Sequence, residues 1–308
     1  MENIKTKFSI LISTKNRIND LKYTLEKLNF ILQSKEVKCT IYDDGSTDGT
    51  FQYVKDNYPK IYLYKNETSK GYLYCRNKML NETNAKYAIS LDDDANFISN
   101  NPLEEIEKYF KENLNCGVLA FRIFWSKKLP LSTLTNEKPL QVKGFVGCGH
   151  VWNVDVWKKI PNYPEWFVFY GEEEFASFQL FKINYQVHYL PSVLVHHRVD
   201  ITSRRNNSDY QQRQRRSFRS GWYLYFLFYP LKLIPKKLLY TLWIQLKNKT
   251  FKGNFTATVG NFQAIIDVIV NLPRLLKNSN RLTISEYNKY VKISDVKIYW
   301  KPQNEKTN

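Results

Sequence analysis

Short apolar runs alternate along the first 200 residues with segments whose apolar positions recur every three or four residues. Five of the runs have the length and composition of buried strands, at 8–12, 39–42, 61–64, 87–91 and 118–125. Segments with helical spacing lie between them, at 21–32, 51–58, 76–80 and 102–113. Strands that alternate with helices in this order predict an α/β fold, with a parallel sheet and helices on both of its faces.

Acidic residues directly follow two of these strands. Asp43 and Asp44 come after the second strand, and Asp92, Asp93 and Asp94 come after the fourth. Ligands of an α/β sheet bind beyond the carboxyl ends of the strands, so both groups fall where a site is expected. Asp43 and Asp44 can accept hydrogen bonds from a base or a ribose. The alternative is an ordinary turn, which Asp, Gly and Ser all favour.

The triplet from Asp92 to Asp94 points to a divalent cation. Alternate carboxylates in a strand-to-loop segment reach one point from the same face, and Mg²⁺ and Mn²⁺ prefer such oxygen ligands. Without a cation, three adjacent negative charges repel one another; a solvated acidic loop is the alternative. His196 and His197 are two of only four histidines and end an apolar strand, so they are candidate metal ligands in the same group.

A second acidic group, Glu172 to Glu174, follows Gly171 and precedes a predicted helix over 175–183. Carboxylates at a helix N-terminus are stabilised by the helix dipole, which is the purely structural explanation. The catalytic explanation is a general base, a carboxylate whose proton affinity is raised by its crowded neighbours. The residues alone leave both explanations open.

Several other kinds of site are missing from the sequence. Neither type of phosphate-binding glycine loop occurs, so the phosphates of a nucleotide must be held by a metal and basic side chains. No Gly-x-Ser-x-Gly motif occurs, which argues against a serine hydrolase. The four cysteines are widely spaced, and the start of the chain lacks the apolar core of a signal peptide, so we expect reduced thiols in the cytosol.

Seven motifs follow one another in a fixed order over about residues 7–200. They are Phe8 to Arg17, Ile41 to Thr50, Gly71 with Arg76-Asn77, Leu91 to Asp94, Gly147 to His150, Gly171 to Glu173, and Pro191 to His197. Together they resemble the family 2 glycosyltransferases with the GT-A fold, a Rossmann-like, mostly parallel sheet flanked by helices. The resemblance implies an inverting, metal-dependent transfer of a hexosyl or deoxyhexosyl group from a nucleotide-diphosphate sugar to a glycan or lipid-linked acceptor. It also implies a place in bacterial cell-surface polysaccharide biosynthesis.

The resemblance implies a role for each matching residue. The residues implied to contact the nucleotide sugar are Thr14, Asn16, Arg17, Asp43, Asp44, Arg76, Asp92 and Asp93. Mn²⁺ or Mg²⁺ is implied at Asp94 and Asp92, with His197 or His196 completing the ligand set. The implied acceptor residues are Gly147, Cys148, Gly149 and His150. The implied base is Glu173, where the family often has Asp, with Glu172 and Glu174 as alternatives.

The charge of the chain divides it into two parts. Its formal net charge is +17. Residues 1–197 hold 25 Lys and Arg against 23 Asp and Glu, a net charge of +2, whereas residues 198–308 hold 21 against 6, a net charge of +15. We therefore predict a GT-A catalytic domain over 1–200 and a mainly helical, basic extension over 201–308.

The extension carries two apolar stripes at helical spacing. The first comprises Leu238, Leu239, Leu242, Trp243 and Leu246, and the second Phe262, Ile265, Ile266, Ile269 and Val270. Basic, Trp-rich helices suit an anionic membrane surface, which we predict as the partner of residues 222–249. For the second helix we favour packing on the catalytic domain or on a second subunit of a homo-oligomer. The expected location is cytoplasmic, peripheral at the inner face of the cell membrane.

Two other functions compete with this interpretation. Arg204, Arg205, Arg213, Arg215 and Arg216 have aromatic residues between them, which suits a nucleic-acid-binding protein. That function leaves the acidic groups unexplained, so we expect no nucleic-acid partner. A sugar nucleotidyltransferase shares the sheet type, but the glycine-rich, Arg-containing loop expected at its N-terminus is missing from this sequence.

Overall fold

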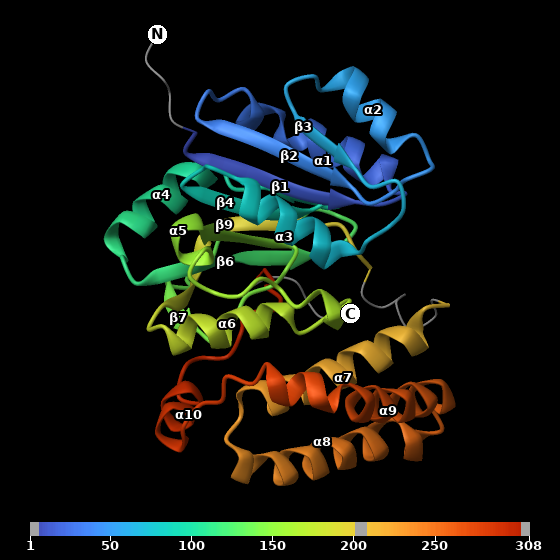
Figure 1. The fold of residues 1–308 in the computed structure, drawn as a ribbon. Helices are drawn as coiled ribbons and strands as arrows, with labels where there is room; N and C mark the ends of the chain where they lie inside the picture. Colours follow the sequence, from blue (N-terminus) through green and yellow to red (C-terminus); the bar gives the residue numbers. More distant parts are fainter. Residues whose placement is uncertain (1–5, 201–207, 303–308) are drawn as a thin grey trace.

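The computed structural model describes residues 6–200 and 208–302 of the chain. Within these ranges nine strands form one sheet, in the order β3-β2-β1-β4-β8-β6-β9-β5, with β7 beside β9 (Figure 1). The strands are β1 (Phe8–Thr14), β2 (Val37–Asp43), β3 (Tyr62–Lys65), β4 (Tyr87–Asp92), β5 (Ala95–Phe97), β6 (Cys116–Trp125), β7 (Leu140–Val142), β8 (Gly149–Asn153) and β9 (Gln186–His197). The predicted α/β fold class is confirmed.

The first four strands along the sheet, β3, β2, β1 and β4, run parallel to one another. Strand β1 is buried along almost its whole length, as expected for a central strand covered on both faces. The register pairs Thr14 with Asp43 on one side of β1 and Ser13 with Asp92 on the other. The carboxyl ends of β2, β1 and β4 therefore meet at one edge of the sheet, which is where the acidic motifs begin.

The remaining strands depart from the predicted parallel pattern. β8 lies antiparallel between β4 and β6, and the short strands β5 and β7 pair antiparallel with β9. Only β6 and β9 are parallel in this half. The alternation of strands and helices that predicts parallel pairing is interrupted after β4, because β5 follows β4 through a tight turn, and β7 and β8 follow β6 with no helix between them.

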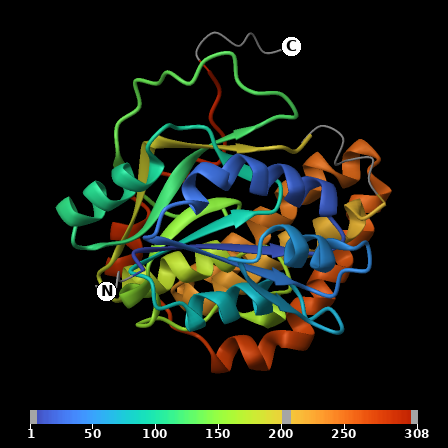
Figure 2. The ribbon, with the colours of Figure 1, turned by 90° about the horizontal axis from the view of Figure 1, so that it is seen from above.

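Helices cover both faces of the sheet, as predicted (Figure 2). On one face, α1 (Ile18–Leu32), α2 (Thr50–Asn57) and α4 (Pro102–Glu112) share a hydrophobic core with the strands. On the other face, α3 (Tyr72–Glu82), α5 (Val154–Trp157) and α6 (Glu172–Lys182) form a second core. A 3-10 helix, η1 (Glu165–Phe167), precedes α6.

The C-terminal region is helical, as predicted, and packs beneath α6 as a further layer (Figure 1). It comprises α7 (Tyr210–Phe228), η3 (Leu231–Leu233), α8 (Ile234–Asn248), η4 (Thr250–Lys252), α9 (Phe255–Lys277) and α10 (Ile284–Tyr290). Apolar side chains of α7, α9 and α10 belong to the same core as α3 and α6. The chain then returns to the sheet, where Ser294 bridges to Val142 and the Trp300 amide donates to the Ile123 carbonyl.

The two-part division at residue 200 stays a prediction. The boundary falls at the edge of residues 201–207, and two of the arginines considered for nucleic-acid binding, Arg204 and Arg205, lie outside the described residues. The remaining three, Arg213, Arg215 and Arg216, lie on α7. Arg213 and Arg215 form ion pairs with Asp209 and Asp267, so part of this basic cluster is neutralised within the chain.

The second apolar stripe of the extension does not pack on the catalytic domain. Phe262, Ile266, Ile269 and Val270 of α9 are all exposed, and only Ile265 packs against the core. The helix instead turns its small residues, such as Ala264, toward the interior. Of the two partners predicted for this stripe, the catalytic domain is therefore wrong for most of its residues, because helical spacing identifies an apolar face without indicating which way that face points. A second subunit stays a prediction.

Candidate active site

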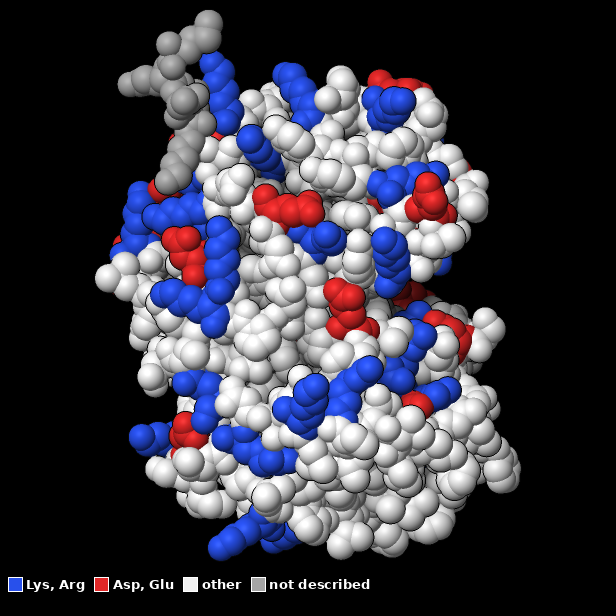
Figure 3. Space-filling model, in the orientation of Figure 1, with Lys and Arg blue, Asp and Glu red and all other residues white. Residues whose placement is uncertain are grey.

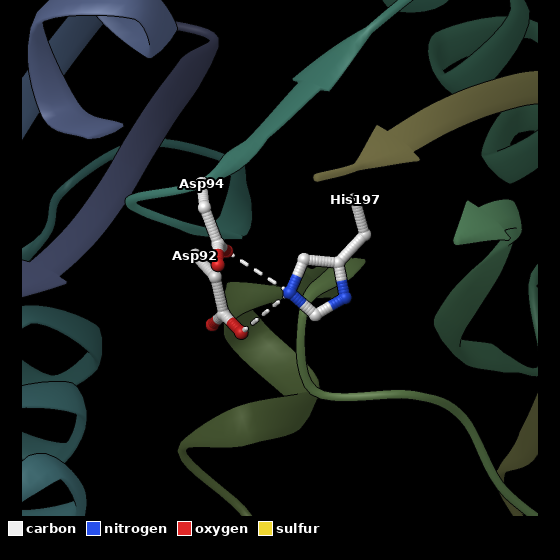
Figure 4. A group of neighbouring side chains, drawn as sticks. All are labelled: Asp92, Asp94 and His197. Carbon is white, nitrogen blue, oxygen red and sulfur yellow. Dashed lines mark ion pairs between the residues drawn. The ribbon is translucent and has the colours of Figure 1, made fainter. Parts of the chain in front are cut away.

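The carboxyl end of β4 and the end of β9 bring two aspartates and a histidine together (Figure 4). β5 pairs antiparallel with β9 and sets Ala95 opposite His197, so Asp94 lies next to the histidine. The Nε2 atom of His197 is 2.9 Å from Oδ1 of Asp94 and 3.9 Å from Oδ2 of Asp92. Burial alone would lower the pKa of His197, but its interactions with Cys148 and Asp94 outweigh this effect and raise the pKa to about 11.

These three residues have the chemistry of a divalent-cation site. Their ligand atoms all lie within 4.8 Å of one another. Carboxylate oxygens suit Mg²⁺ and Mn²⁺, and an imidazole nitrogen adds a ligand of the kind that transition metals accept. Asp92 is half-exposed, whereas Asp94 and His197 are buried. A metal ion at this point must displace the proton on His197, so its binding would release protons.

The other candidate histidine is not part of this group. Successive side chains of a strand point to opposite faces, so His196 faces away from His197. Its Nε2 atom lies 2.8 Å from the Ser126 carbonyl oxygen, and its ring packs on Phe124. The structure thus does not bring His196 to the acidic residues.

Asp93, the middle residue of the triplet, is buried, and both of its carboxylate oxygens have partners within the protein. It accepts a hydrogen bond from the Thr14 hydroxyl and forms an ion pair with Arg17, whose guanidinium also contacts Asp94. Burial raises the pKa of Asp93 to about 7 despite the nearby arginine. Thr14 and Arg17 therefore fix the acidic loop from the side of β1, and Asp93 acts as an anchor for its neighbours.

The two aspartates that follow β2 differ in how many of their acceptors are used. Asp44 accepts hydrogen bonds from Asn66, Ser69, Lys70 and Gly71, so both of its oxygens are occupied in holding that loop. These hydrogen bonds outweigh burial and lower the pKa of Asp44.

Asp43 keeps a free acceptor at the same strand end. Its Oδ1 atom accepts from the Ser46 amide, while its buried Oδ2 has no partner. Asn16, with a positive φ of 52°, links the β1 and β2 loops through the Ser46 hydroxyl and the Thr47 amide. Of the two aspartates, Asp43 is therefore the one with hydrogen-bonding capacity left for a ligand.

Arg76 is buried and contacts three of its neighbours in the site. Its Nη2 atom donates to Oδ1 of Asp92 at 2.8 Å and to the Gly147 carbonyl oxygen at 2.7 Å, and its guanidinium lies over the Tyr72 ring. Its buried Nη1 has no partner. Arg76 thus fixes Asp92, while the Cys148 carbonyl accepts from the Asp92 amide.

The segment from Gly147 to His150 is buried and lies beside Glu173. His150 is fully buried against the Phe145 ring, and Cys148 and Gly149 are buried as well. A Cβ at Gly147 would lie 2.5 Å from Oε1 of Glu173 and 3.1 Å from the Tyr72 hydroxyl. The glycine therefore leaves room for the Glu173 carboxylate, and the other three residues are held inside the fold.

The three glutamates occupy the first turn of α6, after Gly171 with a positive φ of 87°. Glu172 is buried, and burial raises its pKa to about 7. Glu173 is half-buried; burial first, and then the charges of Glu172 and Glu174, raise its pKa well above the ordinary value. Glu174 is exposed. A carboxylate with raised proton affinity at an accessible position is the expected form of a general base.

Two cavities lie on either side of Tyr72 and Glu173. The first, which we call the acidic cavity, has a volume of about 220 Å³; it is lined by the aspartate triplet and His197, together with Ser13, Arg17, Tyr72 and Arg213. The second, which we call the α7 cavity, has a volume of about 340 Å³; its lining includes Phe145, Tyr170, Glu173, Glu174, Ser220 and Leu224. Since the Tyr72 hydroxyl and the Glu173 carboxylate both lie beside Gly147, the two cavities adjoin there.

Sequence reasoning missed several residues of these cavities. Tyr72 carries no recognisable signal beyond its place after Gly71. Arg213 and Ser220 come from α7, more than 100 residues beyond the acidic triplet. The sequence marks Arg213 only as part of a basic cluster and does not mark Ser220. The cavities also do not include His150, Cys148 or Gly149 among their lining residues. Only the packing of the C-terminal helices against the sheet identifies this wall of the site.

Comparison with known sequences identifies a family. The sequence model of a family described as "Glycosyl transferase family 2" matches residues 9–178, which is more than half of the chain. No curated protein matches the chain.

Solved structures share the fold at low sequence identity. The crystal structure of GalNAc-T7 with UDP, GalNAc and Mn²⁺ is 14% identical with a TM-score of 0.57; the match covers 74% of this chain and 49% of that one. The mannosyltransferase PcManGT from Pyrobaculum calidifontis, with GDP-Man and Mn²⁺, is 12% identical with a TM-score of 0.55, and the match covers 93% and 79%. TarS of S. aureus is 16% identical with a TM-score of 0.51, and the match covers 71% of this chain and 43% of that one. The chain thus spans about half the length of GalNAc-T7 and TarS.

Proposed function

The chain belongs to glycosyl transferase family 2, and from this premise we propose that it moves a sugar from a nucleotide-diphosphate donor to an acceptor hydroxyl, with inversion at the anomeric carbon. The observation that carries the proposal is the position of Glu173, which lies where the acidic cavity and the α7 cavity adjoin. We assign the donor to the acidic cavity and the acceptor to the α7 cavity. The donor sugar is a hexose or deoxyhexose, and the setting is bacterial cell-surface polysaccharide assembly.

The acidic cavity suits the donor. Arg17 and Arg213 line it and supply positive charge in a chain that has no phosphate-binding glycine loop. Asp43 is buried outside this lining, at the neighbouring strand end, and its unpaired oxygen would accept from a base or ribose. Asp92, Asp94 and His197 would hold Mn²⁺ or Mg²⁺, and the imidazole makes Mn²⁺ the better fit. When bound, the ion would neutralise charge on the diphosphate leaving group. GalNAc-T7 and PcManGT, which have this fold, bind Mn²⁺ together with a nucleotide or nucleotide sugar.

The reacting step uses Glu173 as the general base. The carboxylate takes the proton of the acceptor hydroxyl while the hydroxyl oxygen attacks the anomeric carbon. The new glycosidic bond forms as the bond from that carbon to the diphosphate oxygen breaks, and the diphosphate leaves with the electron pair. Attack from the α7 cavity, on the side away from the acidic cavity, inverts the configuration. Arg76 supports the step indirectly, because it holds Asp92 and lies beside Glu173.

A donor screen tests the proposal. The full-length protein is incubated with UDP, GDP and dTDP sugars, with and without Mn²⁺, and release of the nucleoside diphosphate is measured. We expect release from one donor class that depends on added Mn²⁺ or Mg²⁺. Release of pyrophosphate would instead identify a sugar nucleotidyltransferase. Steep, salt-dependent DNA binding with no donor turnover would identify a nucleic-acid-binding protein.

A further inference from the structure

Helix α9 packs with its small side chains inward. Its buried residues include Ala257, Gly260, Ala264 and Val268, which face α7. The contact is close, because a Cβ at Gly260 would lie 2.8 Å from the Gln211 carbonyl oxygen of α7. The inner face of α9 thus resembles a helix–helix contact built on small residues, and most of the large apolar side chains of α9 lie outside the core, with Val268 and Leu275 as exceptions.

Those large side chains form a continuous exposed stripe. Its members are Phe255, Val259, Phe262, Ile266 and Ile269, at steps of four and three residues along α9, and Leu276, two helical turns beyond Ile269. The exposed fraction is 64% for Phe262 and 66% for Ile269. An ordinary surface helix directs its apolar stripe into the core and its polar side to water. In α9 this arrangement is reversed, which indicates a surface that is covered by something else.

Helix α8 and η4 extend the same apolar surface. In α8, Ile234 is the single buried residue among the described ones, whereas Leu239 and Trp243 are exposed. The Trp243 ring contacts the ring of Phe251 in η4, which is also exposed. We call the exposed apolar residues of α8, η4 and α9 the α8–α9 face.

The charges around the α8–α9 face are almost all positive. Residues 231–277 contain eight Lys and Arg and a single acidic residue, Asp267. Asp267 points inward and forms ion pairs with Arg215 and Arg219 of α7. The exposed basic residues are Lys232, Lys236, Lys247, Lys252, Arg274 and Lys277. In Figure 3 the lower part of the molecule, over α8 and α9, is a broad uncharged area with basic side chains at its margin.

We propose that the α8–α9 face docks onto an anionic lipid bilayer. Exposed Trp, Phe and Ile side chains would enter the interface between headgroups and acyl chains, and the surrounding lysines would contact anionic headgroups. By length and composition α9 is the one helix among the described residues that is long and apolar enough to cross a membrane. The close contact of α9 with α7 and the inward ion pair of Asp267 instead hold this helix against the protein. We therefore place α9 along the membrane surface and not across the bilayer.

A second copy of the chain fits this face less well. In a twofold dimer the same surface meets itself, so lysine would face lysine with no acidic residue between them. Like charges across an interface oppose association. An anionic bilayer supplies the complementary charge that a second α8–α9 face lacks.

The bilayer would lie close to the acceptor. α7 places Ser217, Ser220 and Leu224 in the α7 cavity and turns the opposite side, with Gln211 and Arg215, toward α9. Helix α7 and, behind it, α9 therefore lie between the α7 cavity and the exposed stripe of α9. If the proposed function holds, this arrangement suits an acceptor carried on a lipid at the inner face of the membrane; docking itself does not depend on that function.

Vesicle co-sedimentation of the full-length protein tests the proposal. The vesicles are phosphatidylcholine alone, or phosphatidylcholine with 30% phosphatidylserine, each at low and high salt. We expect binding to the anionic vesicles that weakens at high salt and little binding to the neutral ones. Equal binding to both kinds, or no binding to either, would overturn the proposal.

Paired variants locate the contact. Phe262→Gln with Ile269→Gln, and Lys236→Gln with Lys247→Gln, should each lower the vesicle partition coefficient by about tenfold or more. The matched controls carry the same changes on exposed residues far from this face, namely Phe30→Gln with Leu114→Gln, and Lys55→Gln with Lys60→Gln. We expect the controls to bind as the wild type does.

Light scattering without lipid separates the bilayer from a second copy. A monomer, in both the wild type and the Phe262→Gln, Ile269→Gln variant, agrees with docking on lipid. A wild-type dimer that this variant converts to monomer would assign the face to a second copy and overturn the proposal. Donor turnover in solution reports on the proposed function separately, so either inference can fail alone.

Discussion

At the scale of single residues, the site depends on how each carboxylate is held. Asp94 is fixed by His197 and Arg17, and Asp92 by Arg76, so two oxygens are presented to one point without rearrangement. Asp93 and Asp44 have similar chemistry, but all their oxygens are used within the protein. The role of each aspartate therefore follows from its partners, which sequence spacing does not reveal.

Asp94→Asn should remove metal-dependent nucleotide binding. The variant keeps the size of the side chain but loses the charge that would hold the cation. We expect Mn²⁺ to raise the affinity of the wild type for UDP or GDP and to have at least tenfold less effect on the variant, on the order of a lost metal contact. Titration calorimetry measures both, with the exposed Asp56→Asn as control. Unchanged Mn²⁺-dependent binding in the Asp94 variant would exclude it as a ligand.

Gly147→Ala should impair catalysis while the fold stays intact. Its Cβ would lie 2.5 Å from Oε1 of Glu173, and the end of that flexible side chain would have to move aside. We expect kcat to fall by about tenfold or more, since small displacements of a catalytic group are costly. The double variant with Glu173→Gln should be no slower than Glu173→Gln alone. Additive losses in the double variant would mean that Gly147 acts independently of Glu173.

Glu172→Gln should stabilise the protein in a pH-dependent way. The folded pKa is about 7, above the ordinary 4.5, so between these values the folded state holds a proton that the unfolded chain releases. The ionisation of Glu172 therefore lowers the free energy of unfolding as pH rises through this window. The total loss is largest above pH 7, where the carboxylate is ionised in both states. We expect the variant to gain about 2–3 kcal/mol at pH 8 and almost nothing at pH 4.5.

Urea unfolding at the two pH values measures this gain, with the exposed Glu104→Gln as a control that shows no such dependence. An equal gain at both pH values would contradict a raised pKa for Glu172.

At the scale of elements, the sequence predicts a helix or strand well where that element has its own apolar pattern, and poorly where it depends on contacts with distant segments. The strands β1 to β4 and helices α1 to α4 were predicted from periodicity, because all of them except the largely exposed β3 bury an apolar pattern of their own. The strands β5, β7 and β8 were missed: two have only three residues, and β8 begins with a glycine. The acidic triplet and His197 were predicted to meet, whereas the wall of α7 was not. Contacts between distant segments leave no local pattern to read.

The close packing of α9 on α7 predicts that Gly→Ala substitutions on these two neighbouring helices change the free energy of unfolding in opposite directions. Gly260→Ala would press a methyl group against the α7 backbone at 2.8 Å and should cost about 1–3 kcal/mol. Gly221→Ala on α7 meets nothing within 4 Å and should be neutral or stabilise by up to about 1 kcal/mol, as expected for alanine in a helix. Urea unfolding compares the two. A Gly260 variant as stable as the wild type would contradict the close contact of α7 and α9.

At the scale of the whole molecule, the positive charge has a definite place. The catalytic sheet is nearly neutral, and the excess lies in the C-terminal region, where part of it is paired inward and part surrounds the α8–α9 face. The same helical layer supplies the wall of the α7 cavity and shares a core with the sheet. The proposed site of catalysis and the proposed docking face thus belong to one continuous body, with α7 between them.

The central claim is that Glu173 is the base of a sugar transfer between two adjoining cavities. The most direct test compares the wild type with Glu173→Gln, using the donor identified by the screen, with transfer measured by product formation and donor binding by calorimetry. The account predicts that transfer falls by about 10²–10⁴-fold in the variant while donor affinity changes little. Glu174→Gln, on the same helical turn, should keep most of the activity. Full transfer by Glu173→Gln would contradict the account.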